Sequence, residues 1–532
     1  MNRLLLLLPL SIGITACNES ISAPAGVSTT QGAATDWPEW GGNSSRNMVS
    51  PGKNPPVEFD PGEKIKGKDE VNAATTKGLK FAVPLGSQAY GTLSVSKGMI
   101  LLGTNNERPF DTKYFIKNKD NGKTVAEDRA ILLCLDEKTG KMVWQLPSPK
   151  LGTGKVSDWE LLGMCSGAAI EGDFAYIATN RCEVLCLDMA GLKNGNQGYQ
   201  DEANYYSTVD NKIIAPGDTD ADIIWRFDMR EDTGVFPHNI TSSNVLVTED
   251  RVYVTTSNGV DWTHTNIPAP EAPSLICLDK KTGKLLGEEA SGISKRCLHC
   301  SWSSPALVTV GGKQQVVFGA GDGFCYGFDF TFKKQDDFDI INELWRYDAN
   351  PKELRMDGDK KRDYNTYEGP SEIIATPVVY KGKVYTHIGQ DPEHGEGKGC
   401  LSCIDPSKTG DQSGKPVWTY TEINRSVSTP SIVDDILYVA DYSGLIHVLD
   451  AITGAKLDTY DTKGHIWGST LHVDGKIYVG NEEGELHILK AGKKLEKIAV
   501  IDFPGSLYAT PVFANGTLYI MTMSQLYAFG TK

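Results

Sequence analysis

A short phrase that recurs along the chain constrains the fold more than any other feature. Residues 134–144 read CLDEKTGKMVW, and variants return as CLDKKTGKLLG and VLDAITGAKLD. Each variant follows a strand-like segment such as DRVYVTTSNG, which itself follows a phrase such as SSPALV or ATPVVYKG. One unit is therefore four short strands with alternating apolar residues and closely spaced turn signals. Such a chain is expected to fold as a repeat architecture rather than as separate ordinary domains.

The chemistry of the turn explains the phrase. Asp136 can accept backbone N–H groups across the turn, and Gly140 can adopt the positive φ that closes it. Trp144 then lies on the outermost strand, where its ring can pack on the neighbouring unit and its indole N–H can donate a hydrogen bond. The residues predicted to dock neighbouring units in this way are Phe81, Trp144, Trp225, Trp345 and Trp418.

The units also predict how the chain closes. They begin near Tyr90, Cys165, Asn239, Trp302, Ile374, Val427, Trp467 and Tyr508. The last unit ends before a fourth strand, so the N-terminal strand around Phe81 is expected to complete it and remove the free edge. The prediction is an all-β, eight-bladed β-propeller. Three units depart from the pattern, since Gly287 and Asp458 stand where Trp is expected and the seventh unit reads ILKAGKKLEK. Blade contacts should be weaker there.

These units resemble the tryptophan-docking repeats of the pyrroloquinoline quinone (PQQ) propeller superfamily, which includes quinoprotein dehydrogenases and BamB-like outer-membrane assembly lipoproteins. The resemblance covers residues 78–532 and implies the fold more strongly than the function, because one scaffold serves both an enzyme and a non-enzymatic protein. Residues 36–77 are predicted to be an N-terminal extension that packs on the propeller.

The N-terminus reads as an export signal. MNRLLLLLPLSIGITAC has an early Arg, an apolar run too short to span a membrane, and small residues before Cys17. It resembles a lipoprotein signal over residues 1–16, with Cys17 lipidated and residues 17–35 a flexible tether. Asn18 favours the outer membrane, facing the periplasm of a Gram-negative-type bacterium. The alternative is a plain secretory signal.

The charge balance bears on the partners. The chain carries 53 Lys and Arg against 68 Asp and Glu, a formal net charge of −15, and has no long basic run. A chain of this kind has no electrostatic hold on a phosphate backbone, so nucleic acid is not expected to bind. The expected contacts are an envelope protein or polymer and, through the lipid, a membrane.

Ligands of propellers bind where loops converge around the central channel, and these loops are rich in polar residues. Two insertions, SNGVDWTHTNIPAPEAPS and GQDPEHGEGKGC, supply most of them. Alignment of the first strands places four aromatic residues in one column near the channel mouth: Tyr90, Trp302, Trp467 and Tyr508. The alternative is a solvated rim with aromatic plugs. The candidate ligand-binding residues are Tyr90, Arg181, His238, Asn239, Asp261, His264, His299, Trp302, Asp391, His394, Glu396, Arg425, Trp467 and Tyr508.

Two cysteine pairs could be bridged. Cys297 and Cys300 form a C-x-x-C motif around His299, and in an exported protein a disulfide ranks first, ahead of a redox pair or zinc. Cys165 begins the first strand of its unit and Cys182 follows the second strand, so antiparallel pairing would bring them together.

The sequence gives little support for a quinoprotein cofactor. The alcohol dehydrogenases of the superfamily have two adjacent cysteines over the quinone, and this sequence has no such pair. It has no C-x-x-C-H motif either, so haem c is not indicated. PQQ with Ca²⁺ stays an open alternative, as in sugar dehydrogenases that lack the pair. Neither catalytic residues nor metal ligands can be assigned.

Three functions remain open. The first is a non-catalytic binding or scaffold protein of the cell envelope, BamB-like, acting through its loop face. The second is a periplasmic quinoprotein-type oxidoreductase that binds PQQ and Ca²⁺ at the channel mouth. The third is a carbohydrate-binding or carbohydrate-cleaving propeller, since aromatic faces and paired carboxylates suit sugars.

Overall fold

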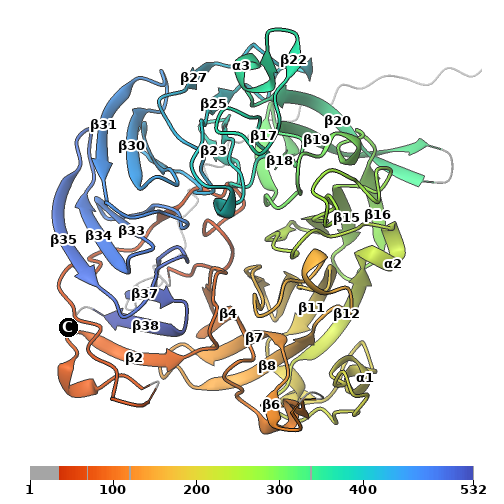
Figure 1. Ribbon diagram of the computed structural model, residues 1–532, viewed down its shortest axis with the longest axis vertical. Helices are drawn as coiled ribbons and strands as arrows, with labels where there is room; N and C mark the ends of the chain where they lie inside the picture. The colour runs from red at the N-terminus through yellow and green to blue at the C-terminus, as the bar shows by residue number, and fades with distance from the viewer. Residues whose placement is uncertain (1–34, 69, 119–120, 336–337, 531–532) are drawn as a thin grey trace, which may run out of the picture. The chain divides into compact units, whose positions relative to one another are not determined.

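Short antiparallel sheets follow one another along the chain in the computed structural model, which describes residues 35–530 except 69, 119–120 and 336–337. The predicted signal peptide, Cys17 and the tether up to residue 34 lie outside the described residues. In Figure 1 the sheets run in chain order around a common centre. No helix among the described residues combines the length and the apolar character needed to cross a membrane.

The first half consists of units of four strands that pair in sequence order, and the first strand of each unit lies nearest the centre (Figure 1). The third and fourth units join through their outer strands in one nine-stranded sheet. The strands are β3 (Ser94–Ser96), β4 (Met99–Asn105), β7 (Arg129–Asp136) and β8 (Met142–Pro149); β9 (Ala169–Glu171), β10 (Phe174–Ala178), β11 (Glu183–Asp188) and β12 (Asp222–Asp228); β13 (Leu246–Val247), β14 (Arg251–Thr255), β15 (Leu275–Asp279) and β16 (Leu285–Glu289); and β17 (Ala306–Val310), β18 (Lys313–Gly319), β19 (Phe324–Gln335) and β20 (Phe338–Asp348).

The second half repeats this order. Its strands are β23 (Val378–Tyr380), β24 (Lys383–His387), β25 (Leu401–Ile404) and β27 (Trp418–Tyr420); β28 (Ser431–Val433), β29 (Ile436–Ala440), β30 (Leu445–Asp450) and β31 (Lys456–Asp461); β32 (Leu471–Val473), β33 (Lys476–Gly480), β34 (Glu485–Lys490) and β35 (Glu496–Asp502); and β36 (Val512–Ala514), β37 (Thr517–Thr522) and β38 (Gln525–Gly530), with β2 (Leu79–Pro84) as the fourth strand.

The rest of the described chain adds only short elements. They are the strand pairs β5 (Phe115–Lys117) with β6 (Thr124–Ala126) and β21 (Met356–Asp357) with β22 (Lys360–Lys361), the strands β1 (Val49–Ser50) and β26 (Gly410–Asp411), and the helices α1 (Glu202–Tyr205), α2 (Met229–Thr233) and α3 (Lys352–Arg355). There are also short 3-10 helices: η1 (Ala73–Thr75), η2 (Thr112–Tyr114), η3 (Gly154–Val156), η4 (Gly191–Asn194), η5 (Ser294–Arg296) and η6 (Pro392–His394). The prediction of an all-β chain is confirmed.

The strand before the first unit lies beside the last strand of the chain. β2 pairs antiparallel with β38, with Phe81 opposite Ala528 and Val83 opposite Leu526. The strand before the first unit therefore supplies the outer strand that the last unit lacks, and β38 has a partner on both sides.

The turns have the predicted chemistry. Asp136 Oδ1 accepts the backbone N–H and the hydroxyl of Thr139 at 2.9 and 2.6 Å, and Gly140 has a φ of +68°. A Cβ on Gly140 would lie 2.5 Å from the ring of Phe81. The glycine thus closes the turn and also leaves the space into which the ring of the preceding sheet packs.

Three tryptophans dock on the next sheet through one repeated contact. The indole N–H of Trp144, Trp225 and Trp418 donates to the carbonyl that follows the turn Asp of the next unit, at 2.9, 3.0 and 3.0 Å. Trp345 instead donates to Gln315 Oε1 of its own sheet at 2.9 Å, and the amide of Gln315 donates to the equivalent carbonyl, that of Pro406, at 3.3 Å. Gln315 therefore relays this contact between sheets.

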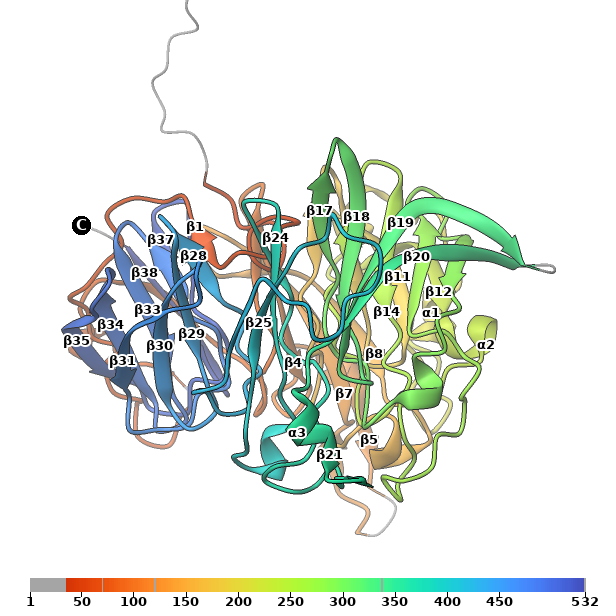
Figure 2. The same cartoon turned by 90° about the horizontal axis from the view of Figure 1, so that it is seen from above.

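Other contacts replace the tryptophan at Asp458 and at Gly287. Asp458 Oδ2 accepts the backbone N–H of Leu495 in the next sheet at 2.8 Å. At Gly287 the space is taken by Phe332, whose ring would lie 2.7 Å from an added Cβ. There β16 also pairs in parallel with β20, whose hairpin with β19 projects beyond the neighbouring sheets (Figure 2).

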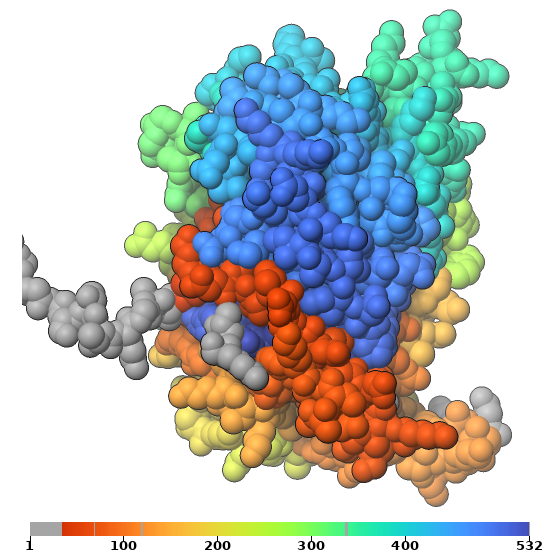
Figure 3. Space-filling model, turned by 90° about the vertical axis from the view of Figure 1, so that its left-hand side faces the viewer, coloured from red at the N-terminus to blue at the C-terminus, as the bar shows by residue number. Residues whose placement is uncertain are grey.

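The segment from residue 36 to residue 50 contacts one sheet after another. Its backbone bonds to the first strands at Val95, Ile170, Leu307, Val379 and His472. Arg46 is fully buried at the centre of this segment, ion-paired with Glu39 at 2.7 Å. Figure 3 shows the N-terminal part of the chain (red) lying across the C-terminal sheets (blue).

The disulfide predictions are wrong for this structure, in which all ten cysteines of the described residues are free. Cys165 Sγ lies 3.7 Å from the carbonyl of Leu162, and Cys182 Sγ lies 3.3 Å from that of Thr256. Cys297 and Cys300 point to the carbonyls of two neighbouring residues of one loop, Asn258 and Ser257, at 3.9 and 3.1 Å. Each of the four thiols thus faces a backbone carbonyl, and none is joined to another cysteine.

Candidate functional site

A cavity of about 290 Å³ opens where the first strands begin. In seven units the fourth residue before the first strand lines this cavity, and these residues form a ring of aromatic, aliphatic and small side chains. Those that line the cavity are Tyr90, Cys165, Ser242, Trp302, Ile374, Val427 and Trp467. The expected unit start at Asn239 lies three residues before the equivalent Ser242, although Asn239 also lines the cavity.

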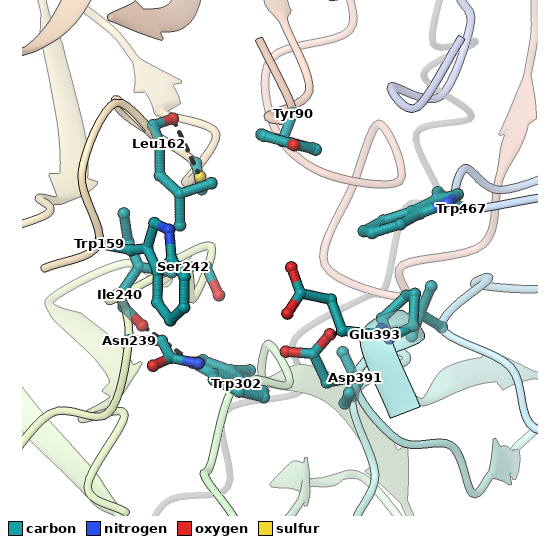
Figure 4. A pocket seen from close by; sticks show the side chains of 14 residues that line it. Tyr90, Trp159, Leu162, Asn239, Ile240, Ser242, Trp302, Asp391, Glu393 and Trp467 are labelled. Atoms are coloured by element: carbon teal, nitrogen blue, oxygen red, sulfur yellow. Dashed lines mark hydrogen bonds between the residues drawn. The ribbon is translucent and has the colours of Figure 1, made fainter. Parts of the chain in front are cut away.

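Aromatic rings form much of the wall. Tyr90 stacks on Tyr508 with ring centroids 5.5 Å apart and lies 6.1 Å from Trp467. Trp159 and Trp302 face the same space (Figure 4). The predicted column of Tyr90, Trp302, Trp467 and Tyr508 is therefore brought together. A ring of flat faces around a cavity suits a cation or a planar group.

Two carboxylates point into the space between these rings (Figure 4). Asp391 and Glu393 come from the start of the short helix η6 (Pro392–His394), where Asp391 Oδ1 accepts the backbone N–H of Glu393 at 3.0 Å. Burial raises the pKa of Asp391, and it raises the pKa of Tyr90 to about 12. Among the described residues no Lys or Arg lines the cavity, so its charge is negative.

A cluster of histidines lies directly behind Trp302. The rings of His238 and His299 have centroids 4.5 Å apart, and His264 is 5.1 Å from each. The ring of Trp302 lies 5.0 Å from that of His299. His394 completes the group at 5.2 Å from His299. These predicted residues belong to separate loops, which the fold brings together.

A chain of hydrogen bonds runs through the cluster. Nδ1 of His238 lies 2.7 Å from the Val260 carbonyl, and its Nε2 lies 2.9 Å from Nε2 of His299. Nδ1 of His299 is 3.1 Å from the hydroxyl of Tyr364, which donates to Glu372 at 2.9 Å. Burial lowers the pKa of His238 to about 3 and that of His299 to about 4, so both rings are neutral at neutral pH.

Other predicted residues lie away from the cavity lining. Arg181 pairs with the buried Glu183 at 3.1 Å, and Glu396 lies 3.6 Å from His465. Arg425 is buried and donates to the Thr366 carbonyl. A further predicted residue, Asp261, instead shapes the loop of His264 by accepting the amide of Asn266 at 2.9 Å.

Sequence reasoning missed Trp159, Tyr364 and Glu372. Trp159 follows a strand that ends its own sheet, and Tyr364 and Glu372 lie in the connection before β23. None of them occupies a repeated position, so the repeat could not reveal them. The only signal was the unusual length of the connections in which they lie.

The cofactor that the resemblance implies can be tested against these residues. PQQ is planar and carries several carboxylates. Tyr90, Trp302 and Trp467 offer it flat faces, but the charged groups of the lining are Asp391 and Glu393. Like charge opposes its entry, so the residues present do not fit the free quinone.

Comparison with known proteins identifies the repeat. The family model described as outer membrane protein assembly factor BamB matches residues 125–331 and 342–532. The outer membrane protein assembly factor BamB of Shewanella oneidensis is 31% identical over 81 residues, which are 15% of this chain and 20% of that protein. The match thus spans about a fifth of that relative's length.

A solved structure of BamB shares the fold at low sequence identity. BamB from Moraxella catarrhalis is 14% identical with a TM-score of 0.52, over 85% of this chain and 99% of that one. Quinohemoprotein alcohol dehydrogenase from Comamonas testosteroni is 12% identical with a TM-score of 0.42, over 94% and 81%. Since the family model covers most of the sequence, this chain belongs to the BamB family of PQQ-repeat β-propellers.

Proposed function

We propose that this chain is a non-catalytic binding protein of the cell envelope, which holds a cationic side chain of a partner protein in the cavity at its channel mouth. The matching family model is described as an outer membrane protein assembly factor. Such a role requires binding to another protein. In this proposal Cys17 carries the lipid that anchors the chain at the outer membrane, on its periplasmic side.

We also propose that the scaffold is a closed ring of eight blades. Its support is the pairing of β2 with β38 and the series of four-stranded units that precede it. A closed ring fixes the loops of distant units relative to one another. That rigidity favours binding, because little conformational entropy is lost when a partner docks.

The observation that carries the proposal is the pairing of aromatic walls with inward carboxylates. Tyr90, Trp302 and Trp467 surround Asp391 and Glu393, which is a site for an ammonium or guanidinium group. An anionic or neutral ligand would leave these two carboxylates without a partner of opposite charge.

The aromatic surface continues outward from the cavity. Trp262 is 61% exposed and stacks on Trp159, with ring centroids 6.5 Å apart. An exposed Trp of this kind is typical of the anchors of protein interfaces. A partner that inserts one side chain into the cavity would therefore also cover Trp262.

The test uses two blocked peptides, Ac-Gly-Arg-Gly-NH2 and its neutral counterpart Ac-Gly-Gln-Gly-NH2, followed by tryptophan fluorescence and ligand-observed NMR. The arginine peptide is expected to saturate one site, and the glutamine peptide is expected to bind at least about tenfold more weakly. The double variant Asp391→Asn, Glu393→Gln should remove that difference because it keeps the shape and deletes the charge.

The matched control is Glu483→Gln. Glu483 is exposed on another loop and does not line the cavity, so its loss should leave the affinity unchanged. Equal affinity for both peptides would show that the cavity does not select a cation. Equal loss in the control and in the double variant would show that the net charge of the protein acts rather than this site.

A further inference from the structure

We propose that His238, His264 and His299 form a metal site that takes Zn²⁺, with a fourth position open toward His394. The candidate ligand nitrogens of the three histidines all lie within 4.8 Å of one another. Imidazole is a preferred ligand of Zn²⁺, and three protein ligands with one open position are a common arrangement. This site lies behind Trp302 and goes beyond the proposed partner binding.

The tautomer of His238 is fixed by its surroundings. Its Nδ1 lies 2.7 Å from the carbonyl of Val260, which can only accept a hydrogen bond. The ring proton therefore sits on Nδ1, and the lone pair of Nε2 points into the cluster. A backbone carbonyl that orients a ligating histidine in this way is a usual feature of metal sites.

His299 has the same kind of support from side chains. Its Nε2 faces that of His238 at 2.9 Å, and its Nδ1 lies 3.1 Å from the hydroxyl of Tyr364. Tyr364 in turn donates to Glu372 Oε1 at 2.9 Å. With an ion at Nε2, the proton of His299 sits on Nδ1 and points to Tyr364, so the buried hydroxyl and carboxylate orient the second ligand.

His264 is the third ligand and the one nearest to solvent. It is only partly buried, whereas the other two are fully buried. Its φ of +57° is held by the bond from its N–H to the Asp261 carbonyl at 3.0 Å. Nearby, Nδ1 of His394 is buried and has no hydrogen-bond partner among the described residues, so a polar group is free beside the open position.

Small movements would complete the coordination. Tetrahedral Zn²⁺ with Zn–N bonds of about 2.0–2.1 Å places its ligand nitrogens about 3.3 Å apart. The two facing Nε2 atoms, now at 2.9 Å, would separate by about 0.4 Å. The widest separation in the group, 4.8 Å at most, would close by about 1.5 Å, which a rotation of the His264 ring supplies.

The C-x-x-C motif contributes its histidine rather than its cysteines. The sulfurs of Cys297 and Cys300 lie 3.9 and 3.1 Å from the carbonyls of Asn258 and Ser257. Neither thiol belongs to the group of converging ligand atoms, whereas His299 between them does. The motif places His299 in the loop from which it meets His238.

The test starts from the purified full-length protein, stripped of metal with a chelator. Calorimetric titration is expected to show one equivalent of Zn²⁺ bound with a Kd below about 1 µM. Co²⁺ should give the strong visible absorption of a tetrahedral centre. His264→Gln and His299→Gln should each weaken Zn²⁺ at least about 100-fold, and Tyr364→Phe about tenfold, because it removes only an outer partner.

The control is His465→Gln, since His465 is half-exposed and lies outside the cluster. It should leave the affinity for Zn²⁺ unchanged, and circular dichroism should show that every variant is folded. Because His264 is only partly buried, its variant keeps the test informative if His299→Gln does not fold. The proposal fails if the folded wild type binds no Zn²⁺, if His264→Gln binds it as tightly, or if Co²⁺ gives an octahedral spectrum.

Discussion

The docking of Trp418 on Gly454 makes a sharp prediction about how neighbouring sheets are coupled. A Cβ on Gly454 would lie 2.6, 2.7 and 2.9 Å from three atoms of the Trp418 ring, and the glycine has a φ of +75°. Gly454→Ala therefore combines two costs, about 1–2 kcal/mol for the left-handed backbone and about 1–3 kcal/mol for the clash with the ring.

Gly475 provides a matched control for the backbone cost. Its φ is +73°, and an added Cβ would meet no atom within 4 Å. Gly475→Ala should therefore cost only the first part, about 1–2 kcal/mol. The difference between the two glycine variants measures the clash with Trp418.

Trp418→Ala removes the partner. It should cost about 3–5 kcal/mol for the lost ring and about 1 kcal/mol more because the Ala451 carbonyl loses its 3.0 Å hydrogen bond. In the double variant the methyl group added at position 454 enters the space that the ring has left. The double variant should therefore be less destabilised than the sum of the single variants, by about 1–3 kcal/mol.

The assay is urea unfolding in a buffer with sucrose, which favours the compact state, followed by fluorescence and circular dichroism together. The comparison uses conditions in which both signals give the same transition. Additivity within about 0.5 kcal/mol would refute the reasoning, and so would equal costs for Gly454→Ala and Gly475→Ala.

Further predictions concern the N-terminal segment, an acid-sensitive pair and the ends of the ring. Arg46→Met leaves Glu39, whose side chain is 17% exposed, without its 2.7 Å partner, and should lower the unfolding free energy by about 3 kcal/mol and expose residues 36–50 to protease. The pKa of Asp441 is held low although burial raises it, because His447 binds its carboxylate at 3.0 Å. The ionised Asp441 carboxylate therefore stabilises the fold above its unfolded-state pKa of about 3.9, and this stabilisation is lost as the pH falls below that value. Asp441→Asn should accordingly flatten the decline of the unfolding free energy below about pH 4. Phe81→Ala should loosen the pairing of β2 with β38, seen as faster amide exchange in both strands.

The repeat could predict what every unit shares. Turn residues such as Asp136 and Gly140 act locally, and the docking of Trp144 depends on one fixed offset within the unit. The ring of residues at the channel mouth could be predicted for the same reason. Each position is set by the backbone of its own unit, so that aligning the units was enough to place Tyr90 beside Trp467.

What belongs to one unit only could not be predicted in this way. Gln315 relays the contact of Trp345 because both side chains happen to reach each other within one sheet. Tyr364 meets His299 across 65 residues of chain, through a connection that no repeat constrains. The disulfide between Cys165 and Cys182 failed for a related reason, since an alignment of strands does not fix where their side chains point.

The most direct test of the proposed function is a calorimetric titration of PQQ, without added Ca²⁺, into the folded protein. The negative cavity of Asp391 and Glu393 predicts no saturable binding of the quinone in a sample that still binds the arginine peptide. Saturable binding of PQQ at one site, lost in Trp302→Ala or Trp467→Ala, would contradict this account and favour an oxidoreductase at the channel mouth.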